Sequence, residues 1–427
     1  MKKRDFALDA GRFFFLIFCL YTSWFREAYG VKQVVLYGST IALTAFVALD
    51  ILRGRRIKLS EIPSVIKMFL IFAIYAFVTG IVVAEDVGRC VSSLLTYIAY
   101  SVVCFDVYYI SKNEGSFDWV FTIIRLCGCI VAIYIFTRGY SYHTSGVYAI
   151  TLGPNNNPNY LGLVMLVAVM AVVYDYERFI KRIWIYLPMV IAFTAVIVLS
   201  ASRKCLICLG VLLIVWLILL IRAISKGQGT KTIASLRRSG PVIILILVIG
   251  VAIGGIYFFN TFSSTNVYAK FLKSVNEGEG LNSRMLLYEE AWDMFLSHPI
   301  VGVGFDQYRV YSSIGKYSHS AYAEILSCHG LIGMAIFYIP IFSMYIKNLK
   351  FCIRDRFRDY TAAVILLIFT VELILGIGQI FIYEFFHLLV LTYISYAWSE
   401  YVRNAAAARR GRENPGRMSA AYGRTGR

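Results

Sequence analysis

Residues 281–333 read LNSRMLLYEEAWDMFLSHPIVGVGFDQYRVYSSIGKYSHSAYAEILSCHGLIG, and polar residues are more concentrated here than elsewhere in a largely apolar chain. The stretch begins with Arg284 on an amphipathic segment and passes a His-Pro and a Gly-Val-Gly turn. It then reaches His319 just before another hydrophobic run. A long polar loop between apolar runs of membrane-spanning length indicates a segment that lies outside the bilayer. We expect the chemistry of the protein in this loop.

Composition excludes an ordinary soluble domain. Of the 427 residues, 59% are hydrophobic and only 16% are charged, and the mean hydropathy is +0.67. The nine cysteines are scattered, several of them inside apolar runs, and show no zinc-ligand spacing with histidines. We therefore expect neither a disulfide framework nor a metal site, and no other cofactor. The predicted fold class is an all-α integral membrane protein.

About twelve transmembrane helices are predicted, all in one multi-spanning domain over residues 1–402. They are expected near residues 12–25, 33–52, 67–84, 91–110, 119–138, 159–175, 184–200, 204–222, 241–258, 328–346, 361–380 and 382–402. The widest gap leaves a large loop over about 259–327, which contains the amphipathic helix. The basic residues 403–427 have the composition of a disordered tail.

The distribution of basic residues predicts the orientation. With a cytoplasmic N-terminus, the inner segments hold 30 Lys and Arg and the outer segments hold 11, while Arg125 falls within the fifth span. Because basic residues favour the cytoplasmic side, both termini are expected there and the large loop is extracytoplasmic. The net charge of +17 is then mostly a topology signal that also attracts membrane lipid headgroups. No aromatic-basic module indicates a nucleic-acid partner.

Two arginines on the outer face are candidate ligands for phosphate. Arg203 lies in LSASRKC between the seventh and eighth expected spans, and Arg284 lies in the first turn of the amphipathic helix. A guanidinium group offers a planar donor fork, so two of them in one pocket can hold a diphosphate without a metal. The alternative for Arg203 is a snorkelling residue that caps a hairpin. The alternative for Arg284 is an interface anchor or an ion-pair partner of Glu289 or Asp293.

The amphipathic helix is expected over Asn282 to Ser297. Its apolar residues recur every three to four positions, and they are Met285, Tyr288, Trp292, Phe295 and Leu296. We expect this aromatic face to rest at the membrane interface.

His319 is the candidate proton-transfer residue. Histidine exchanges a proton near neutral pH, and His319 ends a polar loop and opens a helix, where it can face both water and headgroups. A structural role is the alternative for any single histidine. His298, His329 and His387 are rival candidates.

Asp106, Arg125, Glu372 and Glu384 fall within expected spans, where a charge is costly unless it is paired or functional. Asp106 and Arg125 are a plausible structural pair between the fourth and fifth spans. Glu372 fits a transport path equally well. This possibility keeps a transporter as an alternative function.

In its C-terminal half the chain resembles the bacterial O-antigen ligase and polysaccharide polymerase superfamily. The first motif is SASRK at 200–204, and the second is Arg284 with Trp292 eight positions on and Gly-Val-Gly at 302–304. The third is His319-Ser-x-Tyr followed by Gly-Leu-Ile-Gly, which ends at Gly333. The superfamily usually has His-Asn where this chain has His319-Ser320. The resemblance covers about residues 190–345.

The resemblance implies a metal-independent glycosyltransferase of the bacterial cell membrane, of the O-antigen ligase or capsule polymerase type. Such enzymes move a glycan from a polyprenyl diphosphate carrier to a hydroxyl of a glycan, lipid or protein on the outer face. By matching positions, Arg203 and Arg284 would hold the diphosphate and stabilise it as the leaving group. His319 would orient or deprotonate the acceptor hydroxyl.

A lipid-linked oligosaccharide flippase or another membrane transporter is the main alternative. A transporter should concentrate polar residues at mid-membrane depth, whereas here the outer loops carry most of them. A structural membrane scaffold would explain the spans but would give no role to two outer arginines and a histidine.

Overall fold

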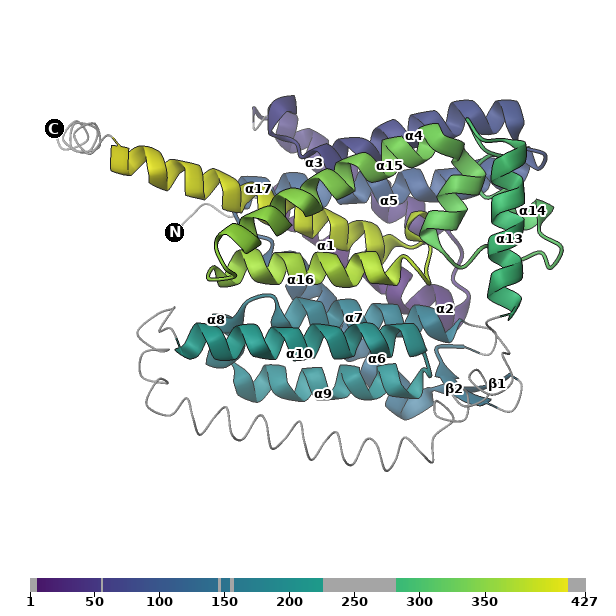
Figure 1. Cartoon of the computed structure of the whole chain (residues 1–427). Coiled ribbons are helices and arrows are strands. Elements are labelled where there is room, and N and C mark those ends of the chain that lie inside the picture. Colours follow the sequence, from purple (N-terminus) through teal and green to yellow (C-terminus); the bar gives the residue numbers. More distant parts are fainter. Residues whose placement is uncertain (1–5, 55–56, 145–146, 154–156, 226–281, 414–427) are drawn as a thin grey trace.

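The computed structural model describes residues 6–54, 57–144, 147–153, 157–225 and 282–413. Long helices lie side by side in a bundle, and one helix crosses an end of it (Figure 1). The expected ninth span at 241–258, the first part of the large loop and the tail beyond Glu413 lie outside the described residues.

The first half of the chain supplies ten α-helices to the described structure. The long ones are α1 Phe6–Leu20, α3 Val34–Leu52, α4 Ser64–Val83, α5 Val87–Glu114, α6 Asp118–Arg138, α7 Pro158–Val173, α9 Ile183–Leu199 and α10 Arg203–Ser225, with the short α8 Tyr176–Lys181 between α7 and α9. A 3-10 turn, Leu59–Glu61, precedes α4. The first span runs on through a π-helical turn, Tyr21–Phe25, into α2 Arg26–Tyr29.

The second half contains the helix that crosses the bundle end. Its elements are α13 Asn282–Ser297, α14 Tyr308–Tyr311, α15 Ala321–Arg354, α16 Tyr360–Leu375, the 3-10 turn Phe381–Tyr383 and α17 Phe385–Glu413. The expectation of a disordered tail from residue 403 is wrong for its first part, because α17 continues as a helix to Glu413. Its four consecutive alanines, 405–408, have the highest helix propensity of any residue.

Seven helices within the described residues are long and apolar enough to cross a membrane. They are the combined α1–α2 helix and α3, α4, α5, α6, α10 and α15. Three more, α7, α9 and α16, are apolar but shorter. All of these lie where spans were expected, which makes this a multi-pass membrane protein. The total of twelve spans stays a prediction.

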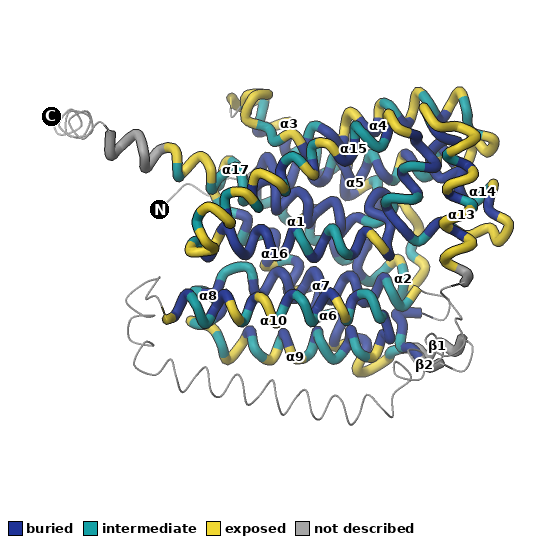
Figure 2. The backbone as a smooth tube through the Cα atoms, in the orientation of Figure 1, coloured by how far each residue is buried: buried dark blue, intermediate teal, exposed yellow. Residues whose placement is uncertain are grey.

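The bundle carries apolar side chains on its outside as well as in its core. On α4, Leu70, Phe77 and Val82 are 62%, 48% and 78% exposed, although Phe69 and Phe72 on the same helix are buried. Figure 2 shows the buried interior and the exposed outer faces of the helices. A helix that is apolar on all sides belongs in a protein core or in a membrane, so these outer faces meet lipid.

One β-hairpin departs from the all-α expectation. β1 Tyr140–Thr144 and β2 Val147–Thr151 pair antiparallel, with Tyr140 opposite Thr151 and Thr144 opposite Val147. The residues are rich in Tyr, Thr, Val and Ile, which favour strands. The hairpin occupies the loop after α6, just before Asn157 and Pro158 begin α7.

The first elements of the large loop and the ends of several helices gather at one end of the bundle, called here the α13 end. α13, α14, α2 and the hairpin lie there, together with the N-terminal ends of α7 and α10 (Figure 1). α17 ends at the opposite end. The arrangement places the sequence-predicted site at the α13 end.

Segment 298–304 fills a break in α15. The break is at Gly330, whose φ of 59° and ψ of −163° are not helical. Four backbone hydrogen bonds of 2.8 to 3.2 Å cross the contact, donated by Leu331 to Pro299, Ile332 to Ile300, Val303 to Ser327 and Gly304 to Cys328. The segment therefore satisfies amides and carbonyls that the broken helix leaves unpaired.

The close approach of segment 298–304 to α15 requires glycine at positions 302 and 330. Gly302 has a φ of +72°, and a Cβ there would lie 2.2 Å from the carbonyl carbon of Cys328. A Cβ on Gly330 would lie 2.4 Å from the backbone of Ile300. Only glycine allows both the left-handed backbone and the contact.

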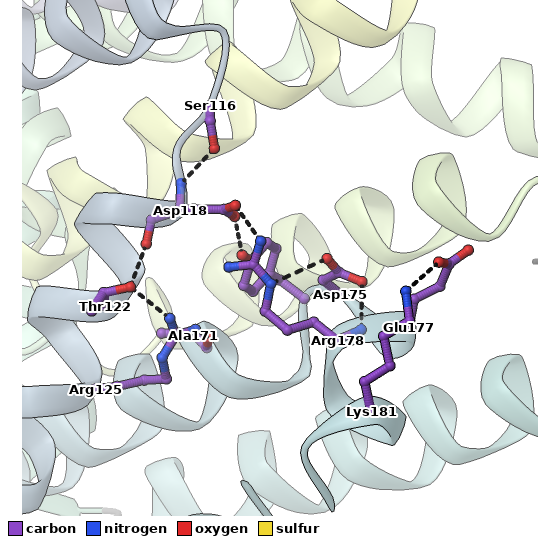
Figure 3. A network of polar contacts seen from close by, with 10 residues as sticks. Ser116, Asp118, Thr122, Arg125, Ala171, Asp175, Glu177, Arg178 and Lys181 are labelled. Carbon is purple, nitrogen blue, oxygen red and sulfur yellow. Dashed lines mark hydrogen bonds and ion pairs between the residues drawn. The ribbon is translucent and has the colours of Figure 1, made fainter. Parts of the chain in front are cut away.

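A network of charged side chains joins the α5–α6 and α7–α8 turns (Figure 3), and α8 lies at the end of the bundle opposite α13 (Figure 1). Arg178 forms an ion pair with Asp118, which also accepts a hydrogen bond from Tyr174, and a second ion pair with Asp175 at 3.7 Å. Lys181 pairs with Glu177 at 3.6 Å. These contacts connect helix ends where they leave the bundle, which is a structural role.

The expected pair between Asp106 and Arg125 is wrong. Asp106 on α5 instead accepts a hydrogen bond from Thr44 on α3 at 2.7 Å. Arg125 on α6 donates to the carbonyl of Ala171 at 2.7 Å and to Thr122 at 2.8 Å (Figure 3). The two residues face different neighbouring helices, so each finds its own hydrogen-bond partners, and one carboxylate oxygen of Asp106 stays buried without a partner in the described structure.

Candidate functional site

The turn between α9 and α10 positions Arg203 at the α13 end. Ala201 in this turn has a φ of 52°, a left-handed conformation that is unfavourable for alanine. The neighbouring Ser202 donates a hydrogen bond to the side-chain oxygen of Asn159 on α7 at 2.9 Å. Arg203 is half-buried at the first position of α10 and lies within electrostatic range of Arg284.

Arg284 is carried by α13, whose predicted bounds are confirmed at Asn282–Ser297. The face of α13 that packs on the protein consists of Leu287, Ala291 and Met294, which are 2%, 4% and 8% exposed and contact the α15 region. Arg284 itself is exposed. In the described part of the chain it makes no ion pair with Glu289 or Asp293, so that alternative is wrong.

Most of the aromatic side of α13 is exposed, although Phe295 is half-buried and the hydroxyl of Tyr288 donates a hydrogen bond to the carbonyl of Ile377 at 3.2 Å. Met285, Tyr288, Trp292 and Leu296 are 58%, 36%, 53% and 59% exposed, and Ile300 just beyond the helix is 62% exposed. The predicted apolar face therefore lies outside the protein core. Its contact with the membrane interface stays a prediction.

His319 is held in a strained backbone conformation just before α15. Its φ is 60°, which is unusual for a residue with a side chain. The amide of Ser318 donates to the buried carboxylate of Glu324 at 2.8 Å, and Tyr383 donates to the other oxygen of that carboxylate at 3.0 Å. Ser320 caps α15 by accepting a hydrogen bond from the amide of Ala323 at 3.4 Å. Residues on both sides of His319 thus fix its position.

The surroundings of His319 disfavour the protonated imidazole. Burial lowers its pKa most, and the positive charges of Lys204, Arg284 and Lys316 lower it further, to about 4. The ring also packs against Tyr317, with 4.4 Å between ring centroids. At neutral pH His319 is therefore a neutral donor and acceptor of hydrogen bonds.

The structure thus brings together the three residues that the sequence singles out and adds one that it did not. We call Arg203, Lys204, Arg284 and His319 the cationic site. Lys204 belongs to the SASRK motif, but the sequence alone indicates no role for it. Its ammonium donates a hydrogen bond to the carbonyl of Gly378 and lies within electrostatic range of Arg284.

The rival histidines lie elsewhere. His329 is fully buried among aromatic rings, with 4.7 Å between its centroid and that of Phe72. His387 is fully buried and pairs with Glu372 at 2.6 Å, so Glu372 has a partner within the bundle. His298 is exposed at the end of α13 and contacts the hydroxyl of Ser297.

A cavity of about 330 Å³ adjoins the cationic site through Lys204, which lines it. The other charged residues in its wall are Arg26, Glu27, Arg309 and Glu384. The guanidinium of Arg309 forms an ion pair with the buried Asp306 at 2.7 Å and lies over the rings of Tyr317 and Tyr383, at 5.6 and 5.8 Å from their centroids. The cavity is therefore polar and charged, and aromatic side chains line part of its wall.

Sequence reasoning missed most of the cavity wall. Residues 376–384 connect α16 to α17 and contribute Gly378, Gln379, Tyr383 and Glu384, but they were assigned to two nearly continuous spans. The run Gly-Ile-Gly-Gln at 376–379 and the charge on Glu384 were the available signals for a break. Arg26 and Glu27 follow the π-helical turn of the first span, a feature often found at functional sites.

The fold and the cationic site define a multi-pass membrane protein with a cluster of basic residues at one end of its helix bundle. Residues 187–338 match the model of a family described as O-antigen ligase. This match confirms the resemblance to the O-antigen ligase and polysaccharide polymerase superfamily, and the matched residues include Arg203, Arg284 and His319. It supports, at a general level, an enzyme that transfers glycans. No curated protein matches the chain.

Proposed function

We propose that this protein transfers or polymerises a surface glycan that is carried on a polyprenyl diphosphate, at the outer face of the bacterial cell membrane and without a metal. The observation that carries the proposal is the convergence of Arg203 and Arg284 beside His319. These arginines come from separate parts of the chain and lie within electrostatic range of each other. Two guanidinium groups this close repel each other, and a bound anion offsets that repulsion because it attracts both. Their proximity therefore favours a ligand with several negative charges.

A diphosphate fits this arrangement. Each guanidinium can hold two phosphate oxygens, and Lys204 adds a third positive charge. Arg203 and Arg284 also lie in the first turns of α10 and α13, where helix N-termini favour anions. Positive charge at the leaving diphosphate stabilises the negative charge that develops there during transfer.

The neutral His319 suits a hydrogen bond to the reacting groups. With a pKa near 4, the ring can donate to a phosphate oxygen or orient an acceptor hydroxyl without carrying a charge. A base that has to accept a full proton would be poorly served by the three neighbouring cations. His319 therefore positions reactants in this proposal.

The exposed face of α13 suits a substrate that is itself anchored in the membrane. Trp292 and its apolar neighbours are the kind of side chain that rests at the level of lipid headgroups. The diphosphate of a polyprenyl carrier lies at the same level. α13 thus brings Arg284 to the depth at which the carrier presents its charged group.

The test is glycan transfer by purified protein in detergent, with donor and acceptor from membranes of the native host lacking this gene. Arg203→Ala, Arg284→Ala and His319→Ala should each lower the transfer rate at least about 100-fold, as loss of one transition-state contact does. Arg354→Ala removes an exposed arginine from the far end of α15 and should leave the rate unchanged. Retained transfer in both Arg284→Ala and His319→Ala would refute the site.

The same assay separates the enzyme from a flippase and tests metal independence. Product formed in detergent, with no sealed vesicles present, excludes transport as the sole function. Addition of EDTA should leave the rate unchanged, since the arginines replace a metal in this mechanism. A rate that EDTA abolishes and Mg²⁺ or Mn²⁺ restores would contradict the metal-independent part.

A further inference from the structure

The cavity beside the cationic site contains a carboxylate that the diphosphate chemistry does not use. Glu384 follows the 3-10 turn before α17 and lines the cavity together with Lys204 and Arg309. Lys204, a member of the cationic site, lies within electrostatic range of both Arg284 and Glu384, so this carboxylate neighbours the cationic site. A second reactant bound in the cavity would therefore lie next to the residues that hold the diphosphate.

Glu384 differs from the other carboxylates near the cavity because its oxygens are not already engaged. Asp306 accepts from Ser93 at 2.6 Å and pairs with Arg309, and Glu27 pairs with Arg26 at 3.4 Å. Glu324 accepts hydrogen bonds from the loop that carries His319. Among the described residues, none donates a hydrogen bond to the side chain of Glu384, although Arg26 and Lys204 attract its negative charge.

The rest of the wall suits a sugar. Gln379 is 7% exposed and donates to the carbonyl of Asn159 at 3.2 Å, while its own side-chain carbonyl is buried and has no partner in the described structure. A buried carbonyl without a partner is costly, and a sugar hydroxyl can satisfy it. Tyr100, Tyr160 and Tyr317 supply the flat apolar surfaces against which sugar rings pack.

We propose that this cavity holds the acceptor sugar and that Glu384 accepts the proton from its attacking hydroxyl. The inference rests on the proposed function, because it assigns the second substrate of the same reaction. Glu384 is then the general base in place of His319. His319 is surrounded by cations, whereas Glu384 is a carboxylate near these cations and accepts no hydrogen bond from the described residues.

The step balances as a single displacement. The acceptor O–H bond breaks, and its proton passes to a carboxylate oxygen of Glu384. The acceptor oxygen forms a bond to the anomeric carbon of the donor while the bond from that carbon to the phosphate oxygen breaks. The electron pair of the broken bond leaves on the diphosphate beside Arg203 and Arg284, and Glu384 later releases its proton to water.

The first experiment separates turnover from donor binding in Glu384→Gln, which keeps the size of the side chain but cannot accept the proton. Transfer is measured with the purified full chain and membrane extract of the native host lacking this gene. Binding is measured with undecaprenyl diphosphate. Turnover should fall at least about 100-fold, the usual contribution of a general base, while undecaprenyl diphosphate binding is retained. Glu289→Gln on the exposed side of α13 is the matched control and should behave as wild type.

The conservative variant distinguishes a base from a structural group. Glu384→Asp keeps a carboxylate at a shorter reach and should recover part of the turnover that Glu384→Gln loses. Equal loss in both variants would contradict the role as a base. Loss of undecaprenyl diphosphate binding in Glu384→Gln would place the residue with the donor and overturn the proposal.

Gln379→Ala tests the acceptor site itself. It should raise the acceptor concentration needed for half-maximal transfer and leave undecaprenyl diphosphate binding unchanged. An unchanged acceptor requirement would overturn the placement of the sugar in the cavity.

Failure of the proposed function gives a different pattern. In that case the wild-type protein neither forms product from the extract nor binds undecaprenyl diphosphate. If only the inference about Glu384 fails, the wild type does both and Glu384→Gln retains its turnover.

Discussion

Ser320 shows how a departure from a family pattern can preserve its physical role. The superfamily usually has asparagine at this position, and here the serine hydroxyl accepts a hydrogen bond from the amide of Ala323 at the start of α15. Asparagine and serine are comparably good helix caps. The substitution therefore keeps the contact that fixes the residue next to His319.

This equivalence predicts that Ser320→Asn retains transfer activity and stability. Ser320→Ala should lose about 1 kcal/mol of unfolding free energy, because the cap is lost, and should also lower the transfer rate because His319 is less well held. Thermal unfolding in detergent and the transfer assay measure the two effects. A Ser320→Asn protein as impaired as Ser320→Ala would show that the cap is not what matters here.

At the level of residues, the sequence predicted the cationic site better than the cavity. Arg203, Arg284 and His319 stand out because each is a polar residue at the edge of an apolar run. Gln379 does not, and Glu384 stands out only as a charge within a span, because their loop is short and apolar enough to be taken for part of two spans. Residues from opposite ends of the chain form the cavity, and nothing local in the sequence shows that they meet.

Segment 298–304 and the broken α15 behave as one element. Gly302→Ala should destabilise the protein by at least about 2 kcal/mol, because a left-handed φ and a Cβ 2.2 Å from Cys328 both act against it. Gly315→Ala is the matched control, since Gly315 also has a left-handed φ of +62° but no atom within 4 Å of the added Cβ. It should cost less, about 1 kcal/mol. Equal losses in thermal unfolding would mean that the contact with α15 does not matter.

The bounds of α13 were predictable, but its packing face was not. Capping and periodicity identify a helix from its own residues, whereas the choice of buried side depends on the partner. Here the partner is α15, and Leu287, Ala291 and Met294 meet it while the larger aromatic residues face outward. The prediction that Asp106 pairs with Arg125 was wrong for the same reason. Which side chains face each other depends on which helices are neighbours in the bundle.

At the scale of the whole molecule, charge distribution predicts that the α13 end is extracytoplasmic. Lys316→Cys should react with a membrane-impermeant maleimide in intact cells, because Lys316 is exposed at that end. Arg354→Cys, exposed at the far end of α15, should react only after the membrane is permeabilised. Eight of the nine native cysteines are buried and Cys129 is half-buried, so a variant that replaces Cys129 serves as the background. The reverse labelling pattern would show that the α13 end is cytoplasmic and that the predicted orientation is wrong.

The spans themselves were predicted well, because apolar length is a property of each segment alone. The β-hairpin at 140–151 and the helical start of the tail were not, because polar connections carry weaker local signals. The sequence thus predicted the apolar spans that a membrane requires. It did not predict the secondary structure of the polar segments that connect or follow them.

The contact between segment 298–304 and α15 also restricts how the protein can change in evolution or by design. Most surface loops tolerate added or deleted residues. Here hydrogen bonds on both sides of the break fix the register, so one extra residue in this segment would shift either Arg284 or Arg309 relative to His319. Chimeras between relatives should therefore exchange residues 282–333 as a single unit, with acceptor preference altered separately through the α16–α17 connection.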